Sequence, residues 1–347
     1  MKNVFSTLAV GLCLMGFSTV FGEDSFDRLP PAEVKEILNK TEIHGLVQAW
    51  YVSSQETTDQ FKLRRGEIQL KGHVTDNVEF FVMIDPTKSV SENKTVGGTT
   101  VRQLKKDGNI LQDLGVTLRV LKNMKLSMGQ LKRPIGFEGL QSSSQLELQE
   151  RAIVSRELSD KRDIGATVQG DVASLKVEYI VGVFNGEGPN TSDTNDKKDV
   201  AGILIFKPNP GVKFYISAYE GSQGVQNDVQ RREGVGVQVE NGPVLLRSEF
   251  LEGKDLNVEK QGWYVLGMFR LNALGLETLD PLRVAARYEE WDADESDAAE
   301  VHIVSVGTQY FFDEKGFTKF GLDYFYSDSK GSEGDDKGLS FGYQVKF

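Results

Sequence analysis

Apolar and polar residues alternate along most of this chain from residue 43 onward. The C-terminus shows the pattern most clearly, because every second residue from Leu339 to Phe347 is apolar and the residues between are Ser, Gly, Gln and Lys. A period of two residues places each class of side chain on its own face of a β-strand. The same alternation recurs at 78–84, 175–183 and 320–326. The sequence therefore predicts many strands with one apolar face.

Sixteen segments of this kind follow one another. Their expected spans are 43–53, 60–73, 76–85, 110–120, 124–134, 161–171, 174–184, 198–207, 211–221, 231–240, 243–252, 260–271, 280–291, 299–312, 316–328 and 338–347. Each span is about 10 residues long, which is the length that a tilted strand needs to cross a bilayer. In the second segment, Phe61 and Leu63 are out of step with the apolar residues after them, so we expect a β-bulge near Arg65 or Gly66.

The connections between these segments differ in length. Tight turns rich in Asn, Asp, Gly and Pro follow several even-numbered strands, whereas the intervening connections are mostly longer, and 86–109 and 135–160 are much longer. This rhythm, with an even strand number, is typical of transmembrane β-barrels. A soluble β-sandwich also alternates. However, charged residues and glycine extend far into the polar faces, and aromatic residues gather toward strand ends, which favours an all-β, antiparallel transmembrane barrel.

The N-terminus has a different composition. Residues 1–22 resemble a secretory signal peptide, with Lys2 before the apolar run 8–17 and a cleavage site before Glu23; an N-terminal membrane anchor is the alternative. Residues 23–42 form a second, periplasmic segment with a short helix near 29–38, which is a linker, a leader or a plug. Residues 43–347 form the barrel. They contain no apolar run of about 18 residues, so any embedding in a membrane is by strands.

Composition excludes several classes of function. The chain has 347 residues and a net charge of −11, which disfavours general affinity for nucleic acids because phosphate binding needs a basic surface. The single cysteine, Cys13, excludes a disulfide scaffold. The three histidines, His44, His73 and His302, have no metal-ligand spacing, and no nucleophile–base pattern or phosphate-binding loop is present. We therefore expect no enzymatic activity, no cofactor and no metal.

Several motifs resemble those of one family. They are Phe61–Gly72, Val82–Pro86, Gly129–Leu140, Gln149–Ser155, Arg162–Ala166 and Gly182–Gly186. Together they make the chain similar to the phosphate-selective porin O/P family of Gram-negative outer membranes, over roughly residues 43–206. The resemblance implies a sixteen-stranded outer-membrane porin that assembles as a homotrimer, among outer-membrane lipid and lipopolysaccharide. It also implies that 135–160 folds inward as a constriction loop.

Side chains on the inner faces of the strands and on this loop would set the selectivity of the pore. The basic candidates for the pore lining and the constriction are Lys62, Arg64, Arg119, Lys125, Arg151, Arg156, Lys161, Arg162, Arg247, Arg283 and Arg287. The opposing acids are Glu67, Glu79, Asp85, Glu147, Glu150, Glu157, Asp160, Glu249 and Glu289. For each basic residue, a salt bridge within the lumen wall is the alternative interpretation. The mixture predicts passive diffusion of small hydrophilic solutes or inorganic anions, and the anion preference rests on the family resemblance.

A second function remains open from the sequence. A barrel of this kind can also serve as a surface-binding protein or adhesin, with its long loops carrying the binding site. The polar loop at 186–198 would suit such a role. The two functions differ in the interior, because a porin needs an open, charged lumen, whereas a binding protein tolerates a packed or plugged one.

Overall fold

The computed structural model describes residue 36 and residues 40–89, 91–96, 99–104, 109–296, 300–330 and 335–347. The expected signal peptide at 1–22 lies outside the described residues, as does nearly all of the expected helix at 29–38. Among the residues that are described, no helix is long and apolar enough to cross a membrane.

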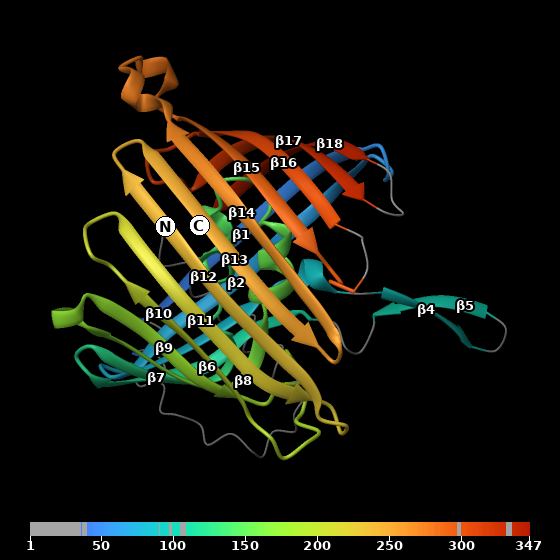
Figure 1. Cartoon of the computed structure of the whole chain (residues 1–347), viewed down its shortest axis with the longest axis vertical. Helices are drawn as coiled ribbons and strands as arrows, with labels where there is room; N and C mark the ends of the chain where they lie inside the picture. The colour runs from blue at the N-terminus through green and yellow to red at the C-terminus, as the bar shows by residue number, and fades with distance from the viewer. Residues whose placement is uncertain are drawn as a thin grey trace.

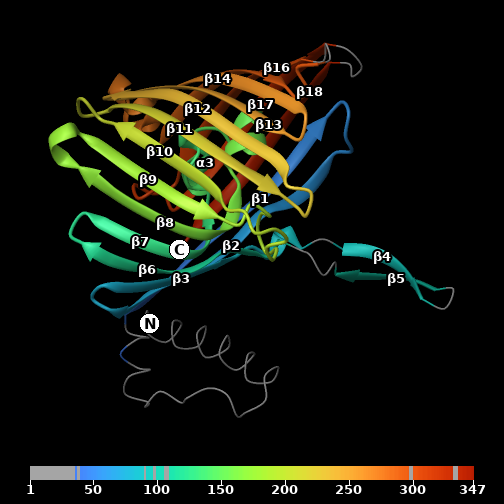
Figure 2. The same cartoon turned by 60° about the horizontal axis from the view of Figure 1, so that its bottom comes forward.

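Sixteen antiparallel strands close into one barrel (Figure 1, Figure 2). The strands are β1 (Thr41–Ser54), β2 (Gln60–Thr75), β3 (Val78–Ile84), β6 (Leu111–Leu121), β7 (Met124–Lys132), β8 (Arg162–Val172), β9 (Val177–Phe184), β10 (Asp199–Phe206), β11 (Val212–Gln223), β12 (Asp228–Asn241), β13 (Val244–Asp255), β14 (Val258–Arg270), β15 (Leu282–Asp292), β16 (Glu300–Phe311), β17 (Thr318–Lys330) and β18 (Asp336–Lys346). Each of the sixteen expected spans overlaps one of these strands, so the predicted fold class is confirmed. Pairing of β1 with β18 closes the sheet and removes its free edges.

The connection between β3 and β6 contains a hairpin that the alternation pattern did not predict. It begins with the turn η1 (Pro86–Lys88) and continues as β4 (Ser91–Val96) and β5 (Thr99–Leu104), which pair with each other in a separate two-stranded sheet. This hairpin extends sideways from the barrel wall (Figure 1, Figure 2).

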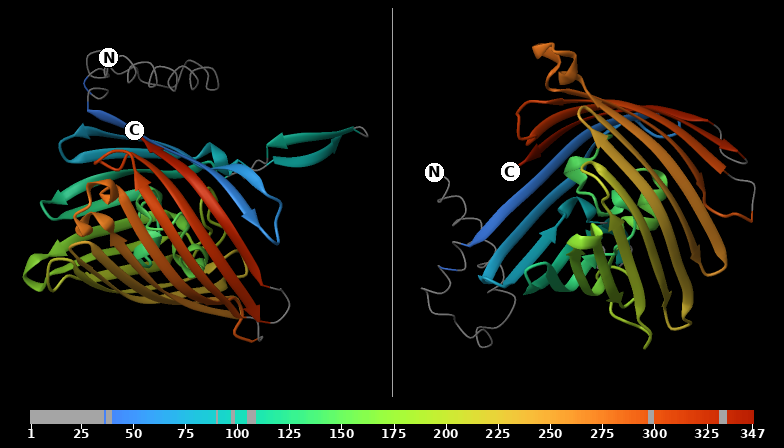
Figure 3. Two further views of the ribbon diagram at one scale, coloured as in Figure 1. Left: turned by 90° about the horizontal axis from the view of Figure 1, so that it is seen from above. Right: turned by 60° about the vertical axis from the view of Figure 1, so that its left-hand side comes forward.

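The two ends of the barrel differ, as predicted. We call the end that holds the start of β1 and the end of β18 the short-turn end, and the opposite end the long-loop end. Two connections depart from the expected rhythm. At the short-turn end, η5 (Leu271–Leu274) and η6 (Glu277–Leu279) form a longer excursion between β14 and β15 (Figure 3). At the long-loop end, β13 and β14 are joined by the tight turn at 256–257.

The segment 133–161 between β7 and β8 folds into the barrel, as predicted (Figure 2, Figure 3). We call it the inward loop. It contains the short helix α3 (Phe137–Leu140), the turn η2 (Ser143–Gln145) and the π-helical turn η3 (Ser155–Ser159); one further turn, η4 (Ala173–Leu175), links β8 to β9. Gly136, with φ of 68°, makes the bend into α3, where a Cβ atom would lie 3.0 Å from Glu249 Oε2.

Candidate functional site: a charged lumen narrowed by the inward loop

Carboxylates on the inner wall hold the inward loop in place. Glu249 on β13 accepts the backbone N–H groups of Phe137 and Glu138, at 2.6 and 2.8 Å. Glu289 on β15 and Asp323 on β17 each accept one further N–H of the loop at 2.6 Å. These three side chains are nearly inaccessible to solvent, and hydrogen bonds to a charged acceptor are among the strong ones. These three acids therefore position the loop rather than line an open channel.

Arg287 is also used as an anchor. Its guanidinium donates to the carbonyl of Glu150 on the loop at 2.9 Å and pairs with Glu289 at 2.9 Å. It is only 5% exposed. The prediction that Arg287 lines the pore is therefore wrong, because the folded loop covers it.

The prediction that Arg151 lines the pore is also wrong, for a different reason. It lies within the loop, where Nε donates to the carbonyl of Glu138 at 2.9 Å and a terminal nitrogen donates to the carbonyl of Gln141 at 2.6 Å. It also pairs with Asp160 at 3.3 Å and is 2% exposed. Burial alone would raise the pKa of Asp160, but Lys132 and Arg151 hold that pKa below its ordinary value. Arg151 thus stabilises the loop instead of facing the channel.

An apolar cluster joins the loop to the wall. Ile135, Leu148, Val154 and Leu158 from the loop belong to one buried core with residues of β9 to β11 and β13 to β15. Strand β14 contributes Tyr264, Leu266 and Met268 to this core from its inner face, while Val265 on its outer face is exposed. A strand that is apolar on both faces therefore marks where the loop packs.

A bulge brings two consecutive arginines to the same face. Gln48 of β1 pairs with Arg65 and Ala49 pairs with Leu63, so Arg64 is the extra residue. The bulge thus lies one residue before the predicted position. Arg64 forms a bidentate pair with Glu150 of the loop, at 2.6 and 3.0 Å, and Arg65 lies 3.5 Å from the same carboxylate. Burial would raise the pKa of Glu150, but Arg65 and Arg64 outweigh it and lower that pKa.

Arg247 is buried and pairs with Glu147 of the inward loop at 3.0 Å. The remaining seven predicted basic residues fall into two groups. Arg119 and Lys125 lie 3.5 and 3.9 Å from Glu79, and Arg162 lies 2.7 Å from Asp113, so these three are salt-bridged on the wall. The second group consists of Lys62 and Arg156, which are exposed, and Arg283 and Lys161, which border cavities. Among the described residues, none of these four has a carboxylate within 4.0 Å.

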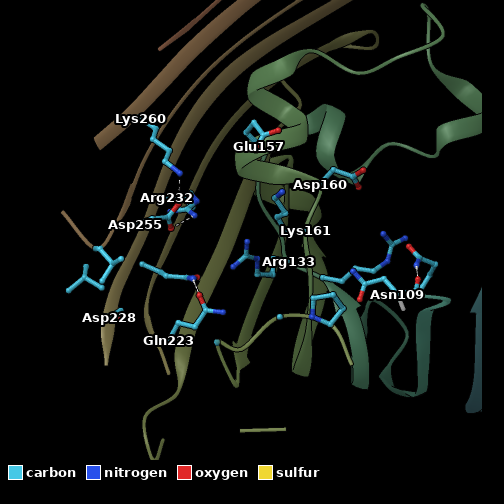
Figure 4. A pocket seen from close by; sticks show the side chains of 18 of the residues that line it. Asn109, Arg133, Glu157, Asp160, Lys161, Gln223, Asp228, Arg232, Asp255 and Lys260 are labelled. Carbon is cyan, nitrogen blue, oxygen red and sulfur yellow. Dashed lines mark hydrogen bonds and ion pairs between the residues drawn. The ribbon is translucent and has the colours of Figure 1, made fainter. Parts of the chain in front are cut away.

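A cavity of about 560 Å³ lies on the long-loop side of the inward loop, and we call it the outer cavity. Figure 4 shows its lining, with Arg232 and Lys260 converging on Asp255 at 2.5 and 3.1 Å. Its basic residues are Lys88, Arg133, Lys161, Arg162, Arg232 and Lys260, and its acids are Glu157, Asp160, Asp228 and Asp255. The outer cavity is therefore close to balanced in charge.

A second cavity, of about 600 Å³, lies on the short-turn side of the loop, and we call it the inner cavity. Its basic residues are Lys213, Arg247, Arg270, Arg283, Lys315, Lys319 and Lys346, and its acids are Glu147 and Glu240. Both acids are paired, Glu147 with Arg247 at 3.0 Å and Glu240 with Arg270 at 2.5 Å. Five cations therefore remain in excess on its walls.

Sequence reasoning missed several residues of the site. Arg65 could have been found, because the change of phase in β2 requires two neighbouring side chains on one face. Lys213 lies between Val212 and Phe214, and Lys319 precedes Phe320, so the alternation of apolar residues places both lysines inward, as it does Arg283. The wall residues that contact the inward loop have no such signal in the sequence, because their contacts depend on the path of the loop through the lumen.

A closed barrel with an apolar outer wall, a charged inner wall and an inward loop between two polar cavities is the architecture of an outer-membrane porin. The chain belongs to the family of phosphate-selective porins O and P, whose model matches residues 43–276. It is an outer-membrane channel for passive diffusion of small hydrophilic solutes or ions, in a Gram-negative bacterium.

Solved structures with the same fold include OmpF of Salmonella typhi in complex with daunomycin, with a TM-score of 0.61 and 12% identity over 88% of this chain and 97% of that chain. An anion-selective porin from Comamonas acidovorans has a TM-score of 0.59 and 10% identity, over 88% and 99%. OmpT of Vibrio cholerae, in its trimer form, has a TM-score of 0.59 and 12% identity, over 88% and 99%. At such identities the likeness concerns the fold alone. No curated protein that was compared matches this chain.

Proposed function

We propose that this porin conducts small anions in preference to cations, and that the inner cavity produces the preference. The observation that carries the proposal is the set of seven basic residues facing two acids that are already paired. Five of these cations have no carboxylate within 4.0 Å among the described residues, so a passing anion can approach them directly. Rings of basic side chains favour anions in pores. The outer cavity, with six basic and four acidic residues, contributes less.

The arrangement of the excess cations supports this function. Arg283 lies over the ring of Phe311 at 3.9 Å, and Lys346 lies over the ring of Phe317 at 5.6 Å. Aromatic faces hold a cation in place without neutralising its charge. An anion passing from the inward loop to the short-turn end is therefore surrounded by positioned positive charges. This arrangement suits inorganic oxyanions and chloride alike, so we propose selectivity by charge rather than specificity for phosphate.

Charge reversal in the inner cavity tests the proposal. Lys213→Glu and Lys346→Glu, made singly and together, are expected to move the reversal potential in a salt gradient toward the cation side, with open steps retained. Lys337→Glu is the matched control, because Lys337 is exposed at the long-loop end, away from the inner cavity. If the double variant has the same reversal potential as the Lys337→Glu control, the inner cavity does not set selectivity.

We further propose that residues 1–22 are removed on export and that residues 23–42 stay periplasmic. We also propose that the barrel at 43–347 assembles as a homotrimer. Its outer wall would contact outer-membrane lipid and lipopolysaccharide. The composition of 1–22 supports export, and the exposed apolar outer wall supports the lipid contact. The trimer form of OmpT supports the assembly. N-terminal sequencing of protein from outer membranes should start at Glu23, and light scattering should give three chains. An N-terminus at Met1, or a monomer, would contradict the respective part.

A further inference from the structure

Three side chains with metal-binding atoms converge on the outer wall, away from the lumen. Glu290 lies near the end of β15, and Glu300 and His302 lie at the start of β16, at the long-loop end. Each offers one ligand atom, and these atoms all lie within 4.8 Å of one another. Glu290 and His302 are direct partners across the two strands. They share the outward face with Tyr288 and Val304, which are 38% and 44% exposed.

The imidazole of His302 lies between the two carboxylates, with one ring nitrogen near each of them. The hydroxyl of Tyr288 lies 2.9 Å from Nδ1, while Nε2 lies 3.3 Å from a carboxylate oxygen of Glu300. Nε2 is enclosed and has no hydrogen-bond partner among the described residues. A ligating histidine commonly donates its other ring N–H to an oxygen, which fixes the tautomer. When Nδ1–H donates to Tyr288, the lone pair of Nε2 faces Glu300, while Glu290 lies 3.6 Å from Nδ1, on the other side of the ring.

The cluster also brings together groups that attract a cation. Glu290 and Glu300 bring two carboxylates together on a face where Trp263 and Tyr288 pack at 5.4 Å. A cation bound between two carboxylates is attracted to both of them. Among the described residues, Glu290 has no lysine or arginine within 4.0 Å. His302 lies 3.6 Å from its carboxylate, through Nδ1.

We propose that Glu290, Glu300 and His302 bind one divalent transition-metal ion of the zinc type, with water completing the coordination. The ligand set decides the chemistry, because one imidazole with two carboxylates suits zinc and its neighbours, whereas calcium and magnesium prefer oxygen alone. The ion would link β15 to β16 on the outside of the barrel, at the level where the long loops begin.

Calorimetry on the refolded, chelator-treated protein tests the proposal, with Zn²⁺ as the probe. One equivalent per chain is expected to bind, and Glu290→Gln or His302→Gln should each abolish it. His44→Gln is the matched control, because His44 is an exposed histidine with a single carboxylate, Glu42, at 3.2 Å. Unchanged stoichiometry in His302→Gln, or binding of Ca²⁺ alone, would overturn the proposal. The cluster faces away from the lumen, so unchanged single-channel conductance shows that each variant is folded.

Trp263 offers a second, local measurement. It pairs with Glu290 across β14 and β15, whereas Trp50 and Trp291 point into the barrel. Paramagnetic Co²⁺ bound at the cluster is expected to quench part of the tryptophan fluorescence, and Trp263→Phe should remove that part. Equal quenching in the wild type, Trp263→Phe and His302→Gln would place the metal elsewhere and overturn the site.

Discussion

The carboxylate of Glu249, in the middle of β13, accepts the backbone N–H of Phe137 at 2.6 Å. This bond ties the first turn of the inward loop to the wall from a strand more than a hundred residues away in the chain. The same carboxylate accepts the hydroxyl of Tyr215 at 2.7 Å and that of Tyr264. The carboxylate of Glu249, a residue that is 1% exposed, thus has hydrogen-bond donors for both of its oxygens, and these bonds fix the position of the loop.

Glu249→Ala is expected to loosen the inward loop. The substitution leaves two backbone N–H groups and two tyrosine hydroxyls without their acceptor, at about 1–3 kcal/mol for each buried group. We expect noisier open-channel current and a lower melting temperature. Glu252→Ala is the control, since Glu252 lies on the same strand but is exposed. Indistinguishable current traces from the two variants would show that Glu249 does not hold the loop.

Two arginines of the inward loop should respond differently to charge reversal. Arg156 is exposed, so Arg156→Glu should move the reversal potential toward cations while the melting temperature changes little. Arg151 is buried and donates to loop carbonyls, so Arg151→Glu should lower the melting temperature and disturb conductance. Planar-bilayer recording and thermal unfolding of both variants check this. The reverse assignment of effects would contradict the placement of the loop.

The arginine pair at the bulge gives a third prediction. Arg65 is 4% exposed and donates to Gln48 at 2.7 Å, whereas the side chain of Arg64 is 29% exposed. Arg65→Ala should therefore destabilise the barrel more than Arg64→Ala does, because it leaves buried partners unpaired. Arg64→Ala should mainly raise conductance. Thermal unfolding and single-channel steps separate the two outcomes, and equal loss of stability would count against the bulge.

The stability of the folded protein is expected to depend on pH because of Glu138. Burial raises the pKa of Glu138 to about 7, from an ordinary value of 4.5. The folded state therefore holds a proton that the unfolded state releases, and the resulting stability, roughly 3 kcal/mol, is full below pH 4.5 and lost as the pH rises to about 7. The melting temperature of the wild type should fall over this range relative to Glu138→Gln. Glu157→Gln, at an exposed position, is the control, and parallel curves for wild type and Glu138→Gln would refute the assignment.

The strands were predictable from the sequence because their signal is local. Alternation from Leu339 to Phe347, or from Phe320 to Tyr326, depends on one wall between lipid and lumen, and it repeats for every strand. The change of phase at Phe61 and Leu63 likewise reported the bulge to within one residue. The hairpin at 91–104 pairs only with itself, so it has no second layer to impose alternation.

The roles of the charged residues could not be predicted in the same way. Whether Arg287 faces water depends on whether Glu150 of the loop lies over it, and that contact spans more than a hundred residues. The same holds for Glu290 and His302 on the outer wall, because the register of β15 and β16, and not their spacing in the sequence, brings them together. The alternation of apolar and polar residues shows which face of the sheet a side chain lies on. The path of the inward loop decides which residue that side chain contacts.

Single-channel recording of the refolded wild-type protein in a planar bilayer, under a salt gradient, measures the proposed anion selectivity itself. We expect stable open steps and a reversal potential on the anion side, because basic residues are in excess in the inner cavity. A cation-side or zero reversal potential would refute the proposed anion preference. A correctly folded barrel without conductance would contradict the channel itself.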